Sequence, residues 1–246
     1  MKQTVTSIFI LFFLTFPFLQ SCESLQGKIV KGNYEIIHEK ISISDYNEIN
    51  LNLPAEVIYE QISQDDPFLQ ITVDKNIYPY LDISVVDNRL VIKTKNDSII
   101  QPTKFTIFTS SKNLQKVDLS GTGNLLMKRQ VNSPKMNIIV AGTGSVKADS
   151  LYCENISVNI AGTGNAEIKG AATFAKFTVH GTGNIRAFDY LTEQLESAIY
   201  GTGNIEAYIH NKLKAEVRGT GSIRYKGNPE SIVSDKTGTG KIVKTD

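Results

Sequence analysis

The residues of this sequence that could take part in chemistry are concentrated in one short motif, Gly-Thr-Gly-(Asn/Ser). A glycine-rich turn can cradle phosphate when a helix N-terminus and a lysine follow it. Here strand-like alternating segments follow the motif, and it contains no column of carboxylates that would bind calcium. The motif therefore predicts a bend that carries polar side chains. The motif occurs seven times, and Lys241 takes the fourth place in the last copy. The first glycines of the seven copies are Gly121, Gly142, Gly162, Gly181, Gly201, Gly219 and Gly238.

Two files of polar side chains follow from this motif if strand alternation runs through the bend. Both glycines then point inward, and the other two residues point outward. We define the threonine file as Thr122, Thr143, Thr163, Thr182, Thr202 and Thr220. We define the asparagine/serine file as Asn124, Ser145, Asn165, Asn184, Asn204 and Ser222. Stacked asparagines can hydrogen-bond along the stack, which is a structural role. The two files also form a regular surface for a ligand, and the sequence leaves both roles open.

Three larger side chains stand immediately before the first glycine of successive copies. They are His180, Tyr200 and Arg218, where the earlier copies have only serine or alanine. Glu216 is expected on the same face, two residues before Arg218. We treat His180, Tyr200 and Arg218 as a candidate local patch. The alternative is an ordinary solvated face.

Catalytic and metal-binding groups are not evident elsewhere in the sequence. The three histidines, His38, His180 and His210, lack ligand spacing, and Cys153 stands in a strand pattern as a small packed side chain. We expect no enzyme activity, no metal and no cofactor. The formal net charge is +1, and Lys2 is the only charged residue among the first 21. This balance removes the electrostatic argument for binding nucleic acid.

The N-terminus is typical of an export signal. Lys2 precedes an apolar run over residues 8–19, which Pro17 interrupts and which is shorter than the ~20 residues of a membrane helix. The segment Leu19-Gln20-Ser21-Cys22 resembles a bacterial lipoprotein box, in which the cysteine becomes the lipidated first residue. The resemblance implies lipidation of Cys22 and an exported protein anchored in the cell envelope, in the outer membrane. The alternative is a secretory signal that ends near Ser21.

The elements that position the motif repeat with it, at intervals of 18 to 21 residues. Even offsets from the first glycine mostly hold apolar residues, and the column two residues before it reads Leu119, Val140, Ile160, Val179, Ile199, Val217 and, in the last copy, Lys236. Outward columns alternate in charge. Five residues after the first glycine stand Lys147, Glu167, Arg186, Glu206 and Arg224, and seven after it stand Lys128, Asp149 and Lys169. Such columns predict an all-β fold, a parallel β-solenoid of about seven rungs of roughly 20 residues each.

The region before the repeats alternates with period two and is predicted to form strands. A hairpin is expected over residues 83–92 around Asp87-Asn88, and a further strand over residues 104–108. This region should cover one end of the solenoid. We divide the chain into a signal peptide (1–21), a tether (22–33), an N-terminal β region that acts as a cap (34–115) and the repeat solenoid (116–246).

The combination of a lipobox, a β region and the repeated tetrads resembles the family of the putative auto-transporter adhesin, head GIN domain. The resemblance covers residues 34–243 and includes Ser222-Ile223-Arg224-Tyr225-Lys226-Gly227-Asn228-Pro229 before the last tetrad. It implies one all-β, helix-like stack over residues 34–246 on the cell envelope. It supplies no catalytic residues to carry over to this sequence.

Three functions are weighed from the sequence. The first is a non-enzymatic envelope lipoprotein, an adhesin or binding module whose threonine and asparagine surface engages a glycan or an envelope protein. The second is a structural or assembly component that pairs through the solenoid end, either with another copy or with a partner. The third, an enzyme on a solenoid scaffold, is least favoured because the carboxylates are spread along alternating ladders.

Overall fold

The structure is a computed structural model that describes residues 29–246. It confirms the predicted all-β class: across this range the chain forms strands, with only two short 3-10 turns, η1 (Tyr78–Tyr80) and η2 (Lys95–Asp97), and no α-helix. The predicted signal peptide and Cys22 lie outside the described residues.

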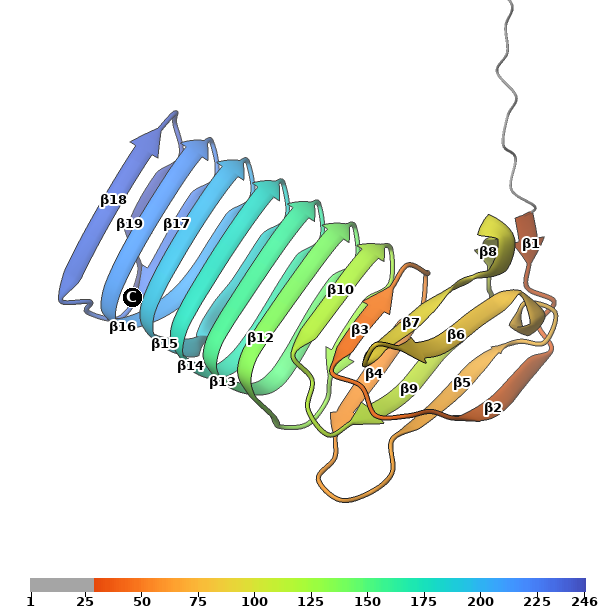
Figure 1. Cartoon of the computed structure of the whole chain (residues 1–246). Coiled ribbons are helices and arrows are strands. Elements are labelled where there is room, and N and C mark those ends of the chain that lie inside the picture. The colour runs from red at the N-terminus through yellow and green to blue at the C-terminus, as the bar shows by residue number, and fades with distance from the viewer. Residues whose placement is uncertain (1–28) are drawn as a thin grey trace, which may run out of the picture.

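The tetrad repeats form a parallel β-solenoid of about six turns (Figure 1). Seven tetrads enclose six intervals, which accounts for the difference from the rung count expected from the motif copies. The strands stack in register, glycine on glycine, as in Gly162↔Gly181↔Gly201. They are β10 (Lys116–Gly121), β11 (Asn124–Met127), β12 (Val131–Gly142), β13 (Ser145–Gly162), β14 (Asn165–Gly181), β15 (Asn184–Gly201), β16 (Asn204–Gly219), β17 (Ser222–Lys226), β18 (Ser231–Thr237) and β19 (Lys241–Lys244).

Each long strand bends once and so contributes to two facing sheets. In β16 the segment after the tetrad pairs with β17, and the segment before the next tetrad pairs with β18. We call these the post-tetrad sheet and the pre-tetrad sheet. Figure 1 shows the pre-tetrad segments as the near row of arrows, whose tips end at the tetrads. The tetrad is therefore a corner that joins one sheet to the other.

The core between the two sheets is built from the predicted apolar ladders. Val179, Ile199 and Val217 are fully buried in adjacent rungs, and the bulky Phe177 fills the neighbouring column. Burying one such aliphatic side chain contributes about 1.5–3 kcal/mol, so the ladders are the main source of the solenoid's stability. Gln115, six residues before Gly121, is an exception among the even offsets, since it is exposed and Leu114 is buried in its place.

Glycine is required at the corner because the rungs approach one another closely. Gly181 has φ +121°, and a Cβ there would lie 2.6 Å from the carbonyl oxygen of Gly162. A Cβ on Gly183 would lie 2.3 Å from the oxygen of Gly164 and 2.6 Å from Cγ2 of Ile160. The second glycine thus faces the core as predicted. The first faces along the stack toward the preceding rung, a direction that simple alternation did not predict.

The region before residue 116 contributes nine strands, and the parallel stacking of the tetrad repeats continues into this region. Strand β3 pairs in parallel with both β10 and β7, and β4 pairs in parallel with both β11 and β9. The nine strands are β1 (Ile29–Lys31), β2 (Ile36–Ser42), β3 (Glu48–Leu51), β4 (Glu56–Gln61), β5 (Phe68–Asp74), β6 (Leu81–Val86), β7 (Arg89–Thr94), β8 (Ile99–Gln101) and β9 (Phe105–Ser111).

Antiparallel strands complete both sheets at this end of the solenoid. Strand β6 pairs with β7, and β5 and β2 extend the other sheet beyond β9. The predicted hairpin is confirmed as β6–β7, with Asp87 and Asn88 at φ 50° and 60°, as a type I′ turn requires. The predicted strand at 104–108 is β9. Residues 29–31 of the predicted tether form β1, which pairs with β8.

A buried carboxylate fastens the chain near the N-terminal end of the described residues. Asp74 accepts hydrogen bonds from the backbone N–H of Tyr34 (2.8 Å) and from Thr103 through both its N–H (2.7 Å) and its Oγ1–H (2.6 Å). Burial alone would raise the pKa of Asp74, but these bonds and one from the N–H of Lys104 outweigh it and lower the pKa below its ordinary value.

Of the two predicted outward columns of alternating charge, one is only partly formed, and the prediction of the other is wrong. Five residues after the first glycine, Lys147 pairs with Glu167 at 3.9 Å, and Arg224 pairs with Glu206. Seven residues after it, the predicted stack of Lys128, Asp149 and Lys169 does not form. The register shifts between Ala148 and Leu151, so that Lys169 pairs with Asp189 at 3.2 Å instead of with Asp149.

Candidate functional site

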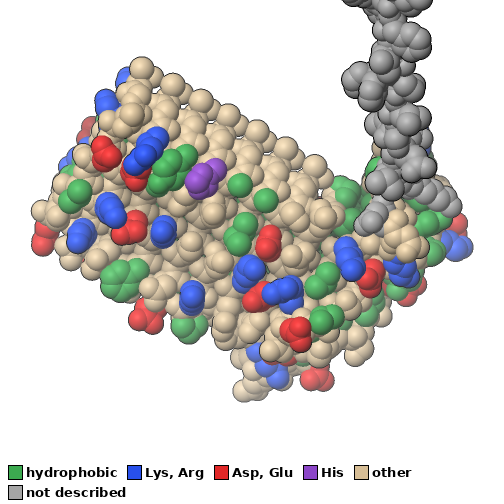
Figure 2. Space-filling model, turned by 45° about the horizontal axis from the view of Figure 1, so that its top comes forward, with side chains coloured by type: hydrophobic (Ala, Val, Ile, Leu, Met, Phe, Trp, Pro, Cys, Tyr) green, Lys and Arg blue, Asp and Glu red, His purple; other side chains and the backbone are tan. Residues whose placement is uncertain are grey.

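The threonine file runs along the outer corner of the solenoid. All six threonines of the file are exposed, and none of their hydroxyls has a hydrogen-bond partner within residues 29–246. Their backbones are fixed, since the N–H groups of Thr182 and Gly183 both donate to the carbonyl of Gly162, at 2.9 and 3.0 Å. In Figure 2 this corner is a broad band free of charged and hydrophobic side chains. The corner therefore displays free hydroxyls at a fixed spacing.

The asparagine/serine file is engaged along the stack. Asn184 Nδ2–H donates to Asn165 Oδ1, and Asn204 Nδ2–H donates to Asn184 Oδ1, both at 3.0 Å. At the first rungs the backbone N–H of Ser145 donates to Asn124 Oδ1. We call Asn165, Asn184 and Asn204 the asparagine ladder. Because its amides already bond to one another, the ladder holds rungs together and offers fewer free groups to a ligand than the threonine file does.

The predicted local patch is brought together beside this corner. His180, Tyr200 and Arg218 are exposed and in register, and the rings of His180 and Tyr200 stack with centroids 4.9 Å apart and planes 13° from parallel. Arg218 Nε–H donates to Glu216, which raises the pKa of Arg218 above its ordinary value. Tyr200 Oη–H also reaches Glu216, at 3.5 Å. The patch is thus an internally bonded aromatic and charged cluster, one residue before the corner.

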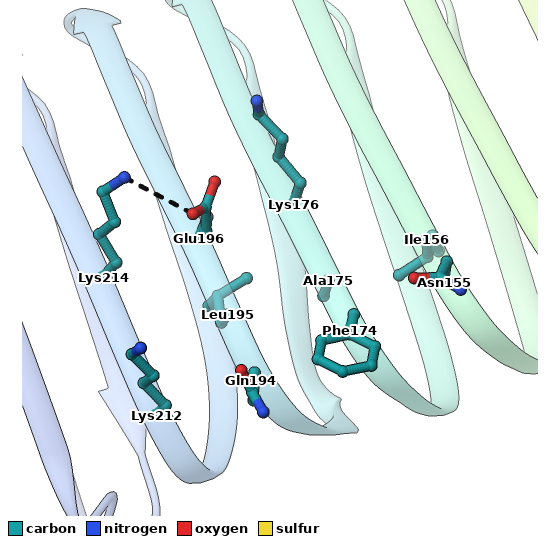
Figure 3. A pocket seen from close by; sticks show the side chains of 10 residues that line it. All are labelled: Asn155, Ile156, Phe174, Ala175, Lys176, Gln194, Leu195, Glu196, Lys212 and Lys214. Atoms are coloured by element: carbon teal, nitrogen blue, oxygen red, sulfur yellow. Dashed lines mark ion pairs between the residues drawn. The ribbon is translucent and has the colours of Figure 1, made fainter.

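A groove on the outer face of the pre-tetrad sheet was not predicted from the sequence. It crosses β13 to β16, has a volume of about 460 Å³, and is shown in Figure 3. Residues of the core, Ile156, Ala175 and Leu195, form its floor. The polar, charged and aromatic side chains around it are Asn155, Phe174, Lys176, Gln194, Glu196, Lys212 and Lys214.

The sequence contains a signal for this groove in two columns of odd offset before the first glycine. The fifth and seventh positions before the first glycine hold Lys176, Glu196 and Lys214, and Phe174, Gln194 and Lys212, on consecutive rungs. A column analysis of these odd offsets finds the lysines. It does not find the hollow, which depends on how the side chains lie across four strands.

The remaining reactive side chains are placed as structural groups. Burial raises the pKa of Cys153 to about 11, so its thiol is a poor nucleophile at neutral pH. His38 bonds to Thr72 through Nδ1 at 2.9 Å. Across the described residues, no three His, Cys, Asp or Glu side chains form a group that could hold a metal ion.

The fold and these surfaces define a class of protein, a solenoid scaffold that displays hydroxyls along one corner and a groove on one sheet. The family follows from comparison with known proteins. The chain belongs to the family described as "Putative auto-transporter adhesin, head GIN domain", whose model matches residues 45–229. This confirms the resemblance found in the sequence. Membership of an adhesin-like family indicates a protein of the cell surface or envelope with a binding role.

Solved structures of similar chains support this placement. A protein described as a putative adhesin from Bacteroides fragilis is 26% identical, with a TM-score of 0.84, over 88% of this chain and 100% of that one. A putative lipid binding protein from Parabacteroides distasonis is 32% identical, with a TM-score of 0.74, over 89% and 100%. A putative adhesin from Parabacteroides merdae is 27% identical, with a TM-score of 0.72, over the same shares. A search of the curated proteins finds no match.

The described part of the chain contains no helix long and apolar enough to cross a membrane.

Proposed function

We propose that the protein is a non-enzymatic binding module of the bacterial cell envelope that presents the threonine file to a glycan or to an envelope protein. The observation that carries this proposal is the row of six exposed threonine hydroxyls without partners in the described structure. Rungs about 4.8 Å apart set the hydroxyls at a regular spacing. Each hydroxyl both donates and accepts hydrogen bonds, as the hydroxyls of a sugar do.

The proposal includes an anchor and a location. Lipidation of Cys22 tethers the exported protein to the outer membrane. A single acyl chain binds membranes only marginally, whereas several acyl chains on one residue make the attachment stable. The motif at residues 19–22 supports this part of the proposal. Incorporation of labelled palmitate in the wild type, and its loss in Cys22→Ser, tests it.

A glycan array with the exported protein tests the threonine file. The triple variant Thr163→Val, Thr182→Val and Thr202→Val removes three adjacent hydroxyls and keeps the β-branched shape that suits a strand. We expect an unchanged circular dichroism spectrum and loss of binding. The control Thr72→Val lies on β5, outside the threonine file, and should bind as the wild type does. Binding by the triple variant at wild-type strength would exclude the threonine file as the contact surface.

The alternative function, a structural component that pairs through the solenoid end, is favoured by one observation. Strand β18 is the last strand of its sheet, and its exposed edge carries Ile232 and Val233, which are 48% and 56% exposed. However, Lys236 stands in register with Val217, in the column that is apolar in every other rung. A charge in an inward column discourages edge pairing. Light scattering over a range of concentrations tests this function, and a strict monomer with no partner in pull-downs argues against it.

A further inference from the structure

The groove on the pre-tetrad sheet is continuous with a second hollow. The smaller hollow, of about 140 Å³, shares Lys176, Glu196 and Lys214 with the groove and reaches Tyr200 of the local patch. From Gln194 to Tyr200 the path follows strand β15, which rises about 3.3 Å per residue, so the path is about 20 Å long. An extended ligand fits such a path better than a compact one does.

The charge around the groove is positive. Three lysines and one glutamate line it, and the glutamate is already paired, with Glu196 Oε1 lying 3.5 Å from Nζ of Lys214. Lys176 and Lys212 have no ion-pair partner among residues 29–246. Figure 3 shows Lys176 and Lys212 on opposite sides of Glu196, on different strands. The two free ammonium groups are therefore spread along the groove and do not converge on one point.

An aromatic side chain with an amide on each side lies at one end of the groove. Phe174 is 44% exposed, and the backbone register places it directly between Asn155 on β13 and Gln194 on β15. An exposed aromatic ring offers a flat apolar face, and side-chain amides both donate and accept hydrogen bonds. The C–H face and the hydroxyls of a sugar ring match these two properties.

We propose that this groove binds an acidic carbohydrate chain, one whose sugars carry carboxylates. Phe174 stacks against a sugar ring, Asn155 and Gln194 bond to its hydroxyls, and Lys176 and Lys212 bond to carboxylates. Lysine forms charge-assisted bonds to carboxylates as a compact point charge. A single phosphate, as in a lipid headgroup, fits less well because the cations are distributed over two strands, β14 and β16, on either side of β15. The inference does not depend on the threonine file, which uses other residues.

Calorimetric titration with oligogalacturonate tests this assignment, with an uncharged galactose oligosaccharide of the same length as the comparison. We expect only the charged probe to bind, and added salt to weaken its binding because the lysines are exposed. In Lys176→Gln/Lys212→Gln we expect Kd to rise about tenfold. In Phe174→Ala we expect a rise of about fivefold.

The matched control is Lys128→Gln/Lys241→Gln, which removes the same charge from exposed lysines away from the groove. It should change Kd by no more than about twofold at moderate salt. The Thr163→Val, Thr182→Val, Thr202→Val variant should bind oligogalacturonate normally, which separates this inference from the proposed function.

Three results would each overturn the inference. They are no binding of oligogalacturonate at millimolar concentration, equal binding of the uncharged probe, and an unchanged Kd in Lys176→Gln/Lys212→Gln. Phosphatidylglycerol vesicles are tested in parallel. Binding to the vesicles that depends on Lys176 and Lys212, without binding of the oligosaccharide, would assign the groove to lipid headgroups instead.

Discussion

The role of the tetrad asparagines can be decided at Asn184, the central member of the asparagine ladder. Replacing it with alanine removes two side-chain hydrogen bonds, each of 3.0 Å, to Asn165 and Asn204. An intramolecular hydrogen bond contributes about 0.5–1.5 kcal/mol net, so the pair contributes about 1–3 kcal/mol. Because both partners are only partly buried, water can hydrate the amides that are freed. We therefore expect Asn184→Ala to lower the free energy of unfolding by about 1–2 kcal/mol.

Urea denaturation followed by circular dichroism measures this change. The m-value of each variant is compared with that of the wild type, so that a shift of the midpoint at constant m reports stability alone. Thr182→Val is the matched control, two residues away on the same corner, and is expected to stay within about 0.5 kcal/mol of wild type. Asn184→Ser, which reproduces the residue found at Ser145 and Ser222, should fall between the two.

Equal stability of Asn184→Ala and Thr182→Val would refute the reasoning. The amides would then be as dispensable to the fold as the threonine hydroxyls are. The asparagine/serine file would then again be a candidate second binding surface, and binding assays would need variants of both files. A loss well above 3 kcal/mol would also contradict the account, because two partly exposed hydrogen bonds cannot supply it.

Three further predictions concern a carboxylate, the solenoid end and a thiol. Asp74 has a lowered pKa in the folded state, so its contribution to stability is present above its ordinary pKa of 3.8 and is lost as pH falls toward the folded value. Asp74→Asn should therefore show a shallower fall of unfolding free energy in an acid titration. Lys236→Val makes the inward column of β18 apolar, and light scattering should then detect concentration-dependent association that the wild type lacks. A monomeric Lys236→Val would show that the lysine does not protect the edge. Since the pKa of Cys153 is about 11, its thiolate fraction at pH 8 is roughly 0.1%. Mass spectrometry should find its alkylation by iodoacetamide about 100-fold slower in the native protein than in urea, and equal rates would contradict its burial.

The solenoid could be predicted from the sequence because its information is repeated. Each inward position is sampled on successive rungs, so the column of Val179, Ile199 and Val217 identifies a buried face more securely than one strand does. The hairpin was predictable for a local reason, since Asp87 and Asn88 are residues that tolerate positive φ. Neither the repeated columns nor the turn residues require knowledge of long-range contacts to be recognised.

The predictions failed where the repeat is not uniform. One rung has two residues, Asp149 and Ser150, where the next has one, Lys169, so counting from the tetrad lost the register beyond that point. The parallel stacking of β3 and β4 was missed because these strands lack a tetrad between them. Their pairing with β10 and β11 depends on the fold alone.

The candidate binding features are departures from the repeat, and they gather on three rungs. The tetrad corner is nearly identical from copy to copy, and its glycine contacts and asparagine ladder fix the spacing of the strands. With that spacing fixed, outward positions on the sheet can vary without loss of register, because they contribute little to burial. Phe174, Lys176, Tyr200, Lys212 and Arg218 all occupy such positions, on β14, β15 and β16. These five positions lie on one face of three adjacent rungs, as the contacts of a localised ligand would. This distribution favours the groove and the patch beside it as the place where a ligand is selected.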